Sequence, residues 1–326
     1  MTAIVLSVIF LCMPLAATAE EDKDRNTISF VMENDIFHSD RYYTNGVRAS
    51  WLLTPGKKSD WALRAAGLVP FFPAESTVHV NYSVGQNMYT PTDITLQNPP
   101  TDDRPYAGWL YGSVGLIAET GKRLDQIELT VGVVGPASFA DETQTFVHKT
   151  IHIDEPQGWS HQLKNEPGFI LTYQRSWRSY VSTSWLGVPF DITPHAGGVL
   201  GNIFTYANTG VTLRYGKKLP SDYGPPRIQP SLPSSGFFVP KKGFGWYLFA
   251  GVEGRAVARN IFLDGNTFRD SDSVKKEPLV GDFQTGLVLT MRNVRIAYTH
   301  VIRSREFKAQ ISHRQDFGAG SLSMQF

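Results

Sequence analysis

Residues 125–135 read D-Q-I-E-L-T-V-G-V-V-G, and this stretch decides the fold class. Ile127, Leu129, Val131 and Val133 recur at every second position, so they share one face of an extended strand. The positions between them are polar or small. About ten residues of such alternation is the length that a tilted membrane strand requires. The stretch therefore predicts a membrane-spanning β-strand.

Eleven further segments show the same alternation. They are residues 27–33, 45–54, 77–87, 108–119, 168–177, 188–198, 205–215, 245–257, 280–291, 294–303 and 318–326. An even total of twelve strands fits a closed bacterial barrel. The sequence thus predicts an all-β fold, a single transmembrane antiparallel β-barrel of about 12 strands. A soluble β-sandwich would alternate in the same way and is the competing interpretation.

The end of the sequence favours the barrel. Leu322, Met324 and Phe326 fall on one face of the last segment, and the sequence stops at the aromatic residue. Such an ending is typical of outer-membrane barrels as a class.

Residues 1–19 are expected to be a cleaved signal peptide, which leaves residues 20–326 as the barrel domain. Residues 4–17 are almost wholly apolar, and Ala17-Thr18-Ala19 fits the small-x-small cleavage pattern. An uncleaved anchor is the alternative, but the run is shorter than the 20 or so apolar residues a span requires. Removal of the signal removes Cys12, the only cysteine, so disulfides are not expected to stabilise the fold.

Composition excludes some partners and membrane helices. Charged residues make up 19% of the chain and the net charge is +1, so no nucleic-acid partner is expected. After the signal, no stretch approaches 18 consecutive apolar residues, which excludes helical spans.

Strand parity gathers the polar motifs at one rim. With a periplasmic N-terminus, the segments after the first, third and fifth strands face the outside, and these are residues 34–44, 102–108 and 136–166. The connections 55–76 and 216–244 would be periplasmic and are long for that side, with a helix expected at 61–66.

Gln144 and His148 are the first candidate site residues. Their spacing of four brings both side chains to one face of a helix, and Asp141 and Glu142 are favourable at a helix start. A neutral imidazole can take a proton from water, so His148 is a candidate general base. The competing interpretation is an ordinary surface-loop histidine.

Asn34, Asp35 and Thr44 form a second candidate group. A carboxylate at a strand end suits a hard cation such as calcium, although Asn-Asp can also serve only a turn. Thr44 could hold a ligand oxygen or begin a strand. Arg104, in D-D-R-P at 102–105, could clamp a substrate phosphate or lie in a solvated turn.

Together these motifs resemble the outer-membrane lipid A 3'-O-deacylase family. The resemblance rests on E-N-D at 33–35, D-x-x-Y-T-N-G at 40–46, D-R-P-Y-A-G-W at 103–109, G-P-A-S at 135–138, Q-x-x-x-H at 144–148 and G-W-S-H-Q-L-K-N-E-P at 158–167. It implies a twelve-stranded barrel with active-site loops at the extracellular side. The implied activity is calcium-dependent hydrolysis of the ester that holds the 3'-linked acyloxyacyl group of lipid A.

The resemblance also implies residue roles. His148 would activate water, Asp35 would ligate calcium, and Asn34, Thr44 and Gln144 would neighbour the reacting centre. Asp154 falls where the family can have an acidic metal ligand. A lysine that the family can carry in the second outer loop has no counterpart in residues 94–98, so recognition or rate can differ.

The expected partners are lipid A or lipopolysaccharide and the outer membrane itself, with the protein a monomer. The chain has no G-x-S-x-G and no H-E-x-x-H motif, so a serine acyl-enzyme with a recognisable signature is not supported. A phospholipase, or a non-enzymatic barrel that acts as a pore or structural protein, would fit the same fold.

Overall fold

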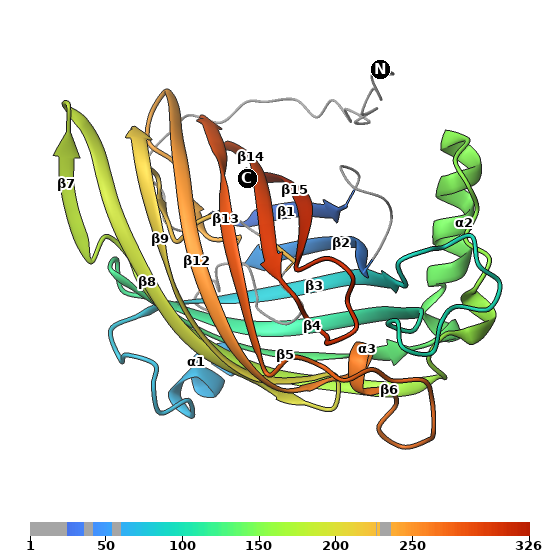
Figure 1. Cartoon of the computed structure of the whole chain (residues 1–326). Helices are drawn as coiled ribbons and strands as arrows, with labels where there is room; N and C mark the ends of the chain where they lie inside the picture. The colour runs from blue at the N-terminus through green and yellow to red at the C-terminus, as the bar shows by residue number, and fades with distance from the viewer. Residues whose placement is uncertain (1–24, 36–41, 54–59, 226, 229–235) are drawn as a thin grey trace.

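A computed structural model describes residues 25–35, 42–53, 60–225, 227–228 and 236–326 (Figure 1). Within these residues, twelve long strands form an antiparallel barrel. They are β1 (Thr27–Asn34), β2 (Tyr42–Leu53), β3 (Thr77–Thr90), β4 (Ala107–Glu119), β5 (Arg123–Val134), β6 (Glu166–Trp177), β8 (Val188–Gly201), β9 (Phe204–Lys217), β12 (Phe244–Asn260), β13 (Leu279–Met291), β14 (Val294–Ser304) and β15 (Arg314–Gln325). Each coincides with one segment predicted from alternation, so the barrel prediction is confirmed.

Pairing of the first and last strands closes the barrel. Thr27 of β1 pairs with Gln325 of β15, and Asn34 pairs with Gly318. On the far side β6 pairs directly with β8. Every strand of the ring therefore has two neighbours, and no long edge of unpaired backbone remains, as a membrane barrel requires.

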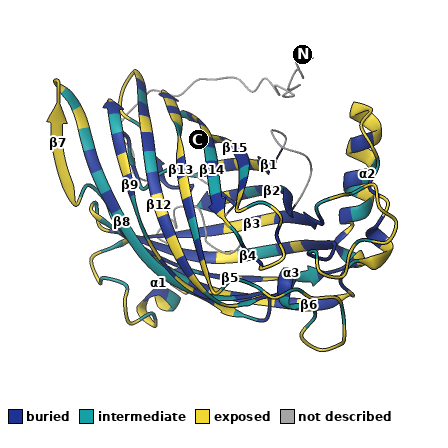
Figure 2. Cartoon of the chain, in the orientation of Figure 1, coloured by how far each residue is buried: buried dark blue, intermediate teal, exposed yellow. Residues whose placement is uncertain are grey.

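Buried and exposed residues alternate along the strands of the wall (Figure 2). In β5 the residues Glu128 and Thr130 point into the lumen and are buried, whereas Leu129 and Val131 point outward and are exposed. Inside the lumen Glu128 accepts hydrogen bonds from Arg48 at 2.9 and 3.1 Å. An apolar outer face over a polar interior is the pattern of a barrel surrounded by lipid.

The long connection between β9 and β12 folds into the lumen, which the sequence did not predict. It carries the short strands β10 (Ser221–Asp222) and β11 (Phe238–Val239). Asp222 forms ion pairs with Arg214 and Arg295, and the backbone N–H of Ile228 donates to Glu33 at 2.9 Å. The β9–β12 connection is long because it reaches into the lumen and contacts the inner face of the wall.

Three helices and one further strand complete the described part of the chain. They are α1 (Asp60–Gly67), α2 (Ala140–Ile151), α3 (Ile261–Asp264) and β7 (Val181–Trp185), with single 3-10 turns at Pro136–Ser138 and Trp159–His161. The predicted helices at 61–66 and around Gln144 and His148 are confirmed. None of these helices has the length and apolar character needed to cross a membrane. The signal peptide prediction lies outside the described residues.

The two ends of the barrel are distinguished by their helices. At one end, called here the α2 rim, β1, β3 and β5 end and α2 stands against the wall. At the other, called the α1 rim, α1 packs against the wall and β7 extends the sheet beyond the ring (Figure 1). All the candidate site residues belong to the α2 rim.

Candidate active site

The site lies on the outer face of the barrel wall. Along the outward face of β3, Tyr82 is 40% exposed and Val84 52%, whereas Gln86, Met88 and Thr90 are 9%, 2% and 0% exposed. These five side chains follow one another at every second position, so all face away from the lumen. The drop in exposure shows that something covers the outer wall at the α2 rim.

The cover is the segment that leads into α2. Gly135 adopts a φ of 94°, a left-handed conformation that favours glycine, and turns the chain back over the wall. The side chain of Gln86 donates to the backbone carbonyl of Ser138 at 2.6 Å. A side chain at Gly108 would collide with Ser138 and Ala140, so glycine there lets the start of the helix contact β4.

Helix α2 presents its two polar candidates to the wall. Ala140, Gln144 and His148 recur every four residues and are the buried positions of the helix. On its other side Phe146 is 70% and Val147 44% exposed. A helix that buries glutamine and histidine while exposing phenylalanine and valine reverses the usual soluble pattern. This reversal fits a helix with lipid outside it.

The ring of His148 is oriented by a backbone carbonyl. Its Nδ1 atom lies 2.5 Å from the carbonyl oxygen of Asp154. A carbonyl can only accept, so Nδ1 carries the proton and Nε2 keeps the lone pair in the neutral ring. The chain reaches this position because α2 ends in a left-handed residue, His152, which turns it back. His148 is thus 3% exposed and held in the tautomer that a general base needs.

Gln144 is oriented by an indole. Trp159 Nε1 donates to Gln144 Oε1 at 2.8 Å, and because indole N–H can only donate, the amide nitrogen Nε2 must point the other way. Among the described residues, none accepts a hydrogen bond from this Nε2 group, although it is buried. Such a donor can stabilise negative charge on a bound ligand.

Aromatic packing holds Trp159 in place. The rings of Trp159 and Tyr106 are 4.8 Å apart, and both belong to one buried cluster with Met88 and Ala140. Tyr106 Oη donates to the carbonyl of Ile94 at 3.2 Å, which ties the 94–98 loop to the site. The D-R-P-Y-A-G-W and G-W-S-H motifs thus supply packing side chains for α2.

The second candidate group lies where β1 ends and β2 begins. The backbone N–H of Asp35 donates to the carbonyl of Thr44 at 3.3 Å, and Asp35 is 2% exposed. Asn34 is opposite Asn45 in the ladder. The register of β2 and β3 shifts between Tyr43 and Asn45, which places Thr44 in a bulge.

Strand β3 links the two groups. Thr90 and Thr44 have their hydroxyl oxygens 2.6 Å apart, and two residues earlier on the same face Met88 packs against Ala140 and Trp159. The polar residues of α2 and those of the β1–β2 end therefore approach the same strand end from two sides.

Two sequence predictions take a different form in the structure. Asp154 has an exposed side chain, and it is its carbonyl that contacts His148. The solvated turn considered for Arg104 is wrong, because the side chain is buried, and the phosphate clamp stays a prediction. The Arg104 side chain is 1% exposed, donates to Glu306 at 3.3 Å and lies over the ring of Tyr89 at 5.0 Å.

The oxygens around Asp35 suit a hard cation. The backbone N–H of Asp35 donates to the carbonyl of Thr44, and the hydroxyl of Thr44 lies 2.6 Å from that of Thr90. Asn34, which precedes Asp35 in the chain, carries an amide oxygen. Calcium takes carboxylate, carbonyl and other neutral oxygens together with water. No cluster of three or more His, Cys, Asp or Glu side chains fit for a metal occurs in the described residues.

At the start of α2, partial burial raises the pKa of the Asp141 carboxyl, against a hydrogen bond from Thr145 that lowers it.

Sequence reasoning did not assign roles to Trp159, Tyr106 or Thr90. Trp159 and Tyr106 stand in motifs that carried the family resemblance, which was the available signal. Thr90 ends a strand and belongs to no motif, so only the fold brings it to Thr44.

Comparison with known proteins gives a family and a fold. A family model described as outer membrane protein LpxR matches residues 4–326. The structure of LpxR from Salmonella typhimurium superposes with a TM-score of 0.74 at 20% identity, over 92% of this chain and 100% of that one. The outer membrane enzyme PagL matches with a TM-score of 0.26 at 12% identity, over 49% of this chain and 90% of that one. No curated protein matches.

Proposed function

Because the chain belongs to the LpxR family of outer-membrane proteins, we propose that it is a lipid A 3'-O-deacylase that hydrolyses the ester of the 3'-linked acyloxyacyl group. The fold, an outer-membrane barrel, fits an enzyme whose substrate stays in the membrane. In this proposal water is the nucleophile and lipid A in the outer leaflet is the partner. The proposal takes the enzyme to act as a monomer.

The observation that carries the proposal is the orientation of His148. The Asp154 carbonyl holds the proton on Nδ1, so Nε2 can take a proton from water as that water attacks the ester carbon. The ring is buried between α2 and the wall, where a substrate can exclude bulk water. An ordinary surface histidine would be neither buried nor held in one tautomer.

Negative charge on the ester oxygen requires a donor or a cation. The Nε2 group of Gln144 is one buried donor, and its direction is set by Trp159. Asp35, with oxygens of Asn34 and Thr44, would hold calcium, which when bound supplies positive charge near the reacting carbonyl. Because the carboxylate at Asp35 is shielded from water, its attraction for a cation is strengthened.

The place of the site explains how a lipid would reach it. Gln144 and His148 face the outer wall, and the exposed residues of α2 include the apolar Phe146 and Val147 as well as Glu142 and Lys149. In this proposal a lipid in the leaflet around the barrel approaches the site from the outer face of the wall without leaving the membrane. A soluble ester would gain nothing from this arrangement.

The lumen argues against a pore. The described parts of the β9–β12 connection cross the interior, where Asp222 pairs with Arg214 and Arg295 and Phe238 lies 4.4 Å from the Arg295 guanidinium. Phe237 packs against His79 on the opposite wall. A water-filled channel would leave these side chains hydrated rather than paired.

The test is deacylation by the His148→Ala variant. The protein, purified in detergent, is incubated with lipid A and calcium, and the mass of lipid A is followed together with fatty acid release. Loss of a general base should lower turnover by about a hundredfold or more. His161→Ala is the matched control, because His161 is exposed in the same loop segment.

Two results would refute the proposal. Full activity of His148→Ala would remove this residue from the mechanism. Unchanged lipid A, with glycerophospholipids cleaved in the same mixture, would make the protein a phospholipase instead.

A further inference from the structure

At the α1 rim, the outer wall is covered by a second helix. Ala62 and Ala66 of α1 pack on Val78, Val80 and Leu116, which are outward-facing residues of β3 and β4. The exposed residues of α1 and of the segment after it are mostly apolar, with Arg64 among them. Trp61 is 49% and Leu63 52% exposed, and Phe71, just after the helix, is 57% exposed. These side chains extend the apolar surface that the strands present to lipid.

Beside α1, a charged cluster stands on the same outer face. Asp125 of β5 points outward yet its side chain is fully buried, because Arg123 and Arg175 lie on either side of it. Arg123 Nε donates to one carboxylate oxygen at 2.7 Å, and Arg175 Nε donates to the other at 2.6 Å. Tyr173 Oη also donates to Asp125, at 2.6 Å.

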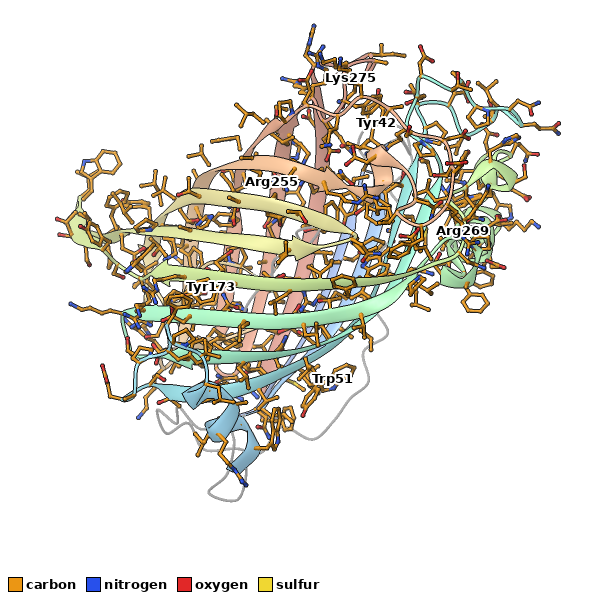
Figure 3. The ribbon with its side chains drawn as sticks, turned by 90° about the horizontal axis from the view of Figure 1, so that it is seen from below. Tyr42, Trp51, Tyr173, Arg255, Arg269 and Lys275 are labelled. Atoms are coloured by element: carbon orange, nitrogen blue, oxygen red, sulfur yellow. The ribbon has the colours of Figure 1, made fainter. Side chains whose placement is uncertain are left out.

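The helix connection ties the cluster down. Both guanidinium groups donate to the backbone carbonyl of Phe71, at 3.2 Å from Arg123 and 3.0 Å from Arg175. The rings of Phe71 and Tyr173 are 5.4 Å apart. In Figure 3, Tyr173 lies toward the end of the barrel away from Arg269 and α2. The two arginines are therefore held in place before any ligand arrives.

The cluster has one positive charge in excess. Two guanidinium groups share the carboxylate of Asp125. Each guanidinium uses two of its five N–H groups, one to donate to Asp125 and one to donate to the carbonyl of Phe71. Their side chains remain 32% and 25% exposed, so the remaining N–H groups can reach a ligand. An anion with several oxygens, such as a phosphate ester, suits paired guanidiniums.

The position of the arginines along the barrel axis indicates which phosphate-bearing molecule they can meet. Arg123 is the first residue of β5 and Arg175 is two residues from the end of β6, so both lie where the wall meets water. An exposed tryptophan of α1, Trp61, is of the residue type that is enriched at the membrane interface. With the α2 rim in the lipid A leaflet, which is the orientation of the proposed function, this rim lies in the phospholipid leaflet.

We propose that Arg123 and Arg175 bind the phosphate of a glycerophospholipid in the periplasmic leaflet, with α1 and Phe71 lining its acyl chains. The site would neutralise the excess charge and give the exposed apolar residues of α1 a partner. It lies at the opposite rim from His148 and takes no part in hydrolysis.

The first experiment measures lipid retention. Barrel protein in detergent is titrated with dioleoyl phosphatidylglycerol and the bound lipid is counted by native mass spectrometry. Arg175→Gln removes the excess charge while leaving Asp125 paired with Arg123, so the fold should persist, as heat-modified gel migration can check. We expect about tenfold weaker retention. Arg292→Gln, at an exposed arginine of the same rim, should bind like the parent protein.

A second experiment measures how deeply α1 lies in the lipid bilayer. The only cysteine is Cys12, in the expected signal, so Leu63→Cys can carry a single fluorescent label in vesicles. Doxyl-labelled phospholipid should quench it, and should quench a label at Arg292→Cys far less. Equal retention by Arg175→Gln and Arg292→Gln would overturn the proposal, as would a Leu63 label quenched only from water.

These results are separable from the proposed function. Arg175→Gln should deacylate lipid A normally, and His148→Ala should retain phospholipid normally. If the deacylase proposal fails, the phospholipid site is still tested by lipid retention. If the phospholipid site fails, deacylation is still tested by the His148→Ala variant.

Discussion

Trp159 Nε1 donates a hydrogen bond to Gln144 Oε1 at 2.8 Å, so the indole of one turn decides the direction of an amide fifteen residues earlier. Both side chains are buried against the barrel wall. Because the amide oxygen accepts from Trp159, the amide nitrogen of Gln144 points away from the indole N–H, and it has no partner among the described residues. The catalytic value of Gln144 should therefore depend on Trp159.

Replacement of Trp159 by phenylalanine should lower kcat about tenfold with little change in KM. The ring packing against Tyr106 is largely kept, but the amide of Gln144 loses the donor that orients it, and one hydrogen bond is worth about 1 kcal/mol. Initial rates of fatty acid release over a range of lipid A concentrations would measure both constants. Trp185→Phe, at an exposed tryptophan of the α1 rim, is the control. An unchanged kcat would show that Trp159 only packs.

Gln144→Glu should reduce kcat more, by about a hundredfold, as expected for loss of an oxyanion donor. Glutamate can still accept from Trp159, so the local structure should remain, but in its ionised form it offers no N–H group and adds negative charge. Single-turnover measurements with lipid A would isolate the chemical step. Turnover equal to that of the parent protein would exclude Gln144 as a donor.

Removal of calcium should stop the reaction, and Asp35→Asn should raise the calcium concentration needed for half-maximal rate. In the proposed site Asp35 would supply a charged ligand beside neutral oxygens, so its loss should weaken binding strongly. Rates are measured against free calcium set by a chelator, with magnesium as the comparison ion. Activity that persists in excess chelator would eliminate the metal from the reaction.

Arg104→Met should lower the free energy of unfolding of the barrel by about 3 kcal/mol. The substitution removes one of the two arginines that pair with the buried carboxylate of Glu306. Arg303 remains 3.6 Å from Glu306 and limits the loss. Urea unfolding followed by tryptophan fluorescence is the measurement. Arg269→Met, at an exposed arginine of the same rim, should unfold like the parent protein. A phosphate clamp would instead show normal stability and raised KM.

The strands could be predicted because the period-two alternation depends only on residues that are neighbours in the sequence. In β3, residues 77–87 alternate without help from any other segment, and the same holds for β5. The prediction fell short at the strand end, where Gln86, Met88 and Thr90 remain outward but are buried. Gln86 contacts Ser138, Met88 packs in one cluster with Ala140 and Trp159, and Thr90 contacts Thr44, so their burial depends on segments distant in the chain.

The site shows the same difference between local patterns, which could be predicted, and long-range contacts, which could not. The four-residue spacing of Gln144 and His148 placed them on one helix face, since helical geometry is local. The role of Asp154 could not be predicted from its side chain, because its carbonyl makes the contact after a left-handed turn at His152. The burial of Arg104 could not be predicted because its partner Glu306 lies about two hundred residues away.

The amino-acid sequence by itself determined the wall of the barrel, the helical spacing of glutamine and histidine, and the family to which the chain belongs. Only the tertiary structure decided that α2 folds onto the outer face of β3, that the β9–β12 connection enters the lumen, and that Arg123 and Arg175 share Asp125. The reason is physical. Alternation and helical spacing follow from the geometry of neighbouring residues, whereas covering a wall or pairing a charge depends on closure of the barrel, which brings distant segments together.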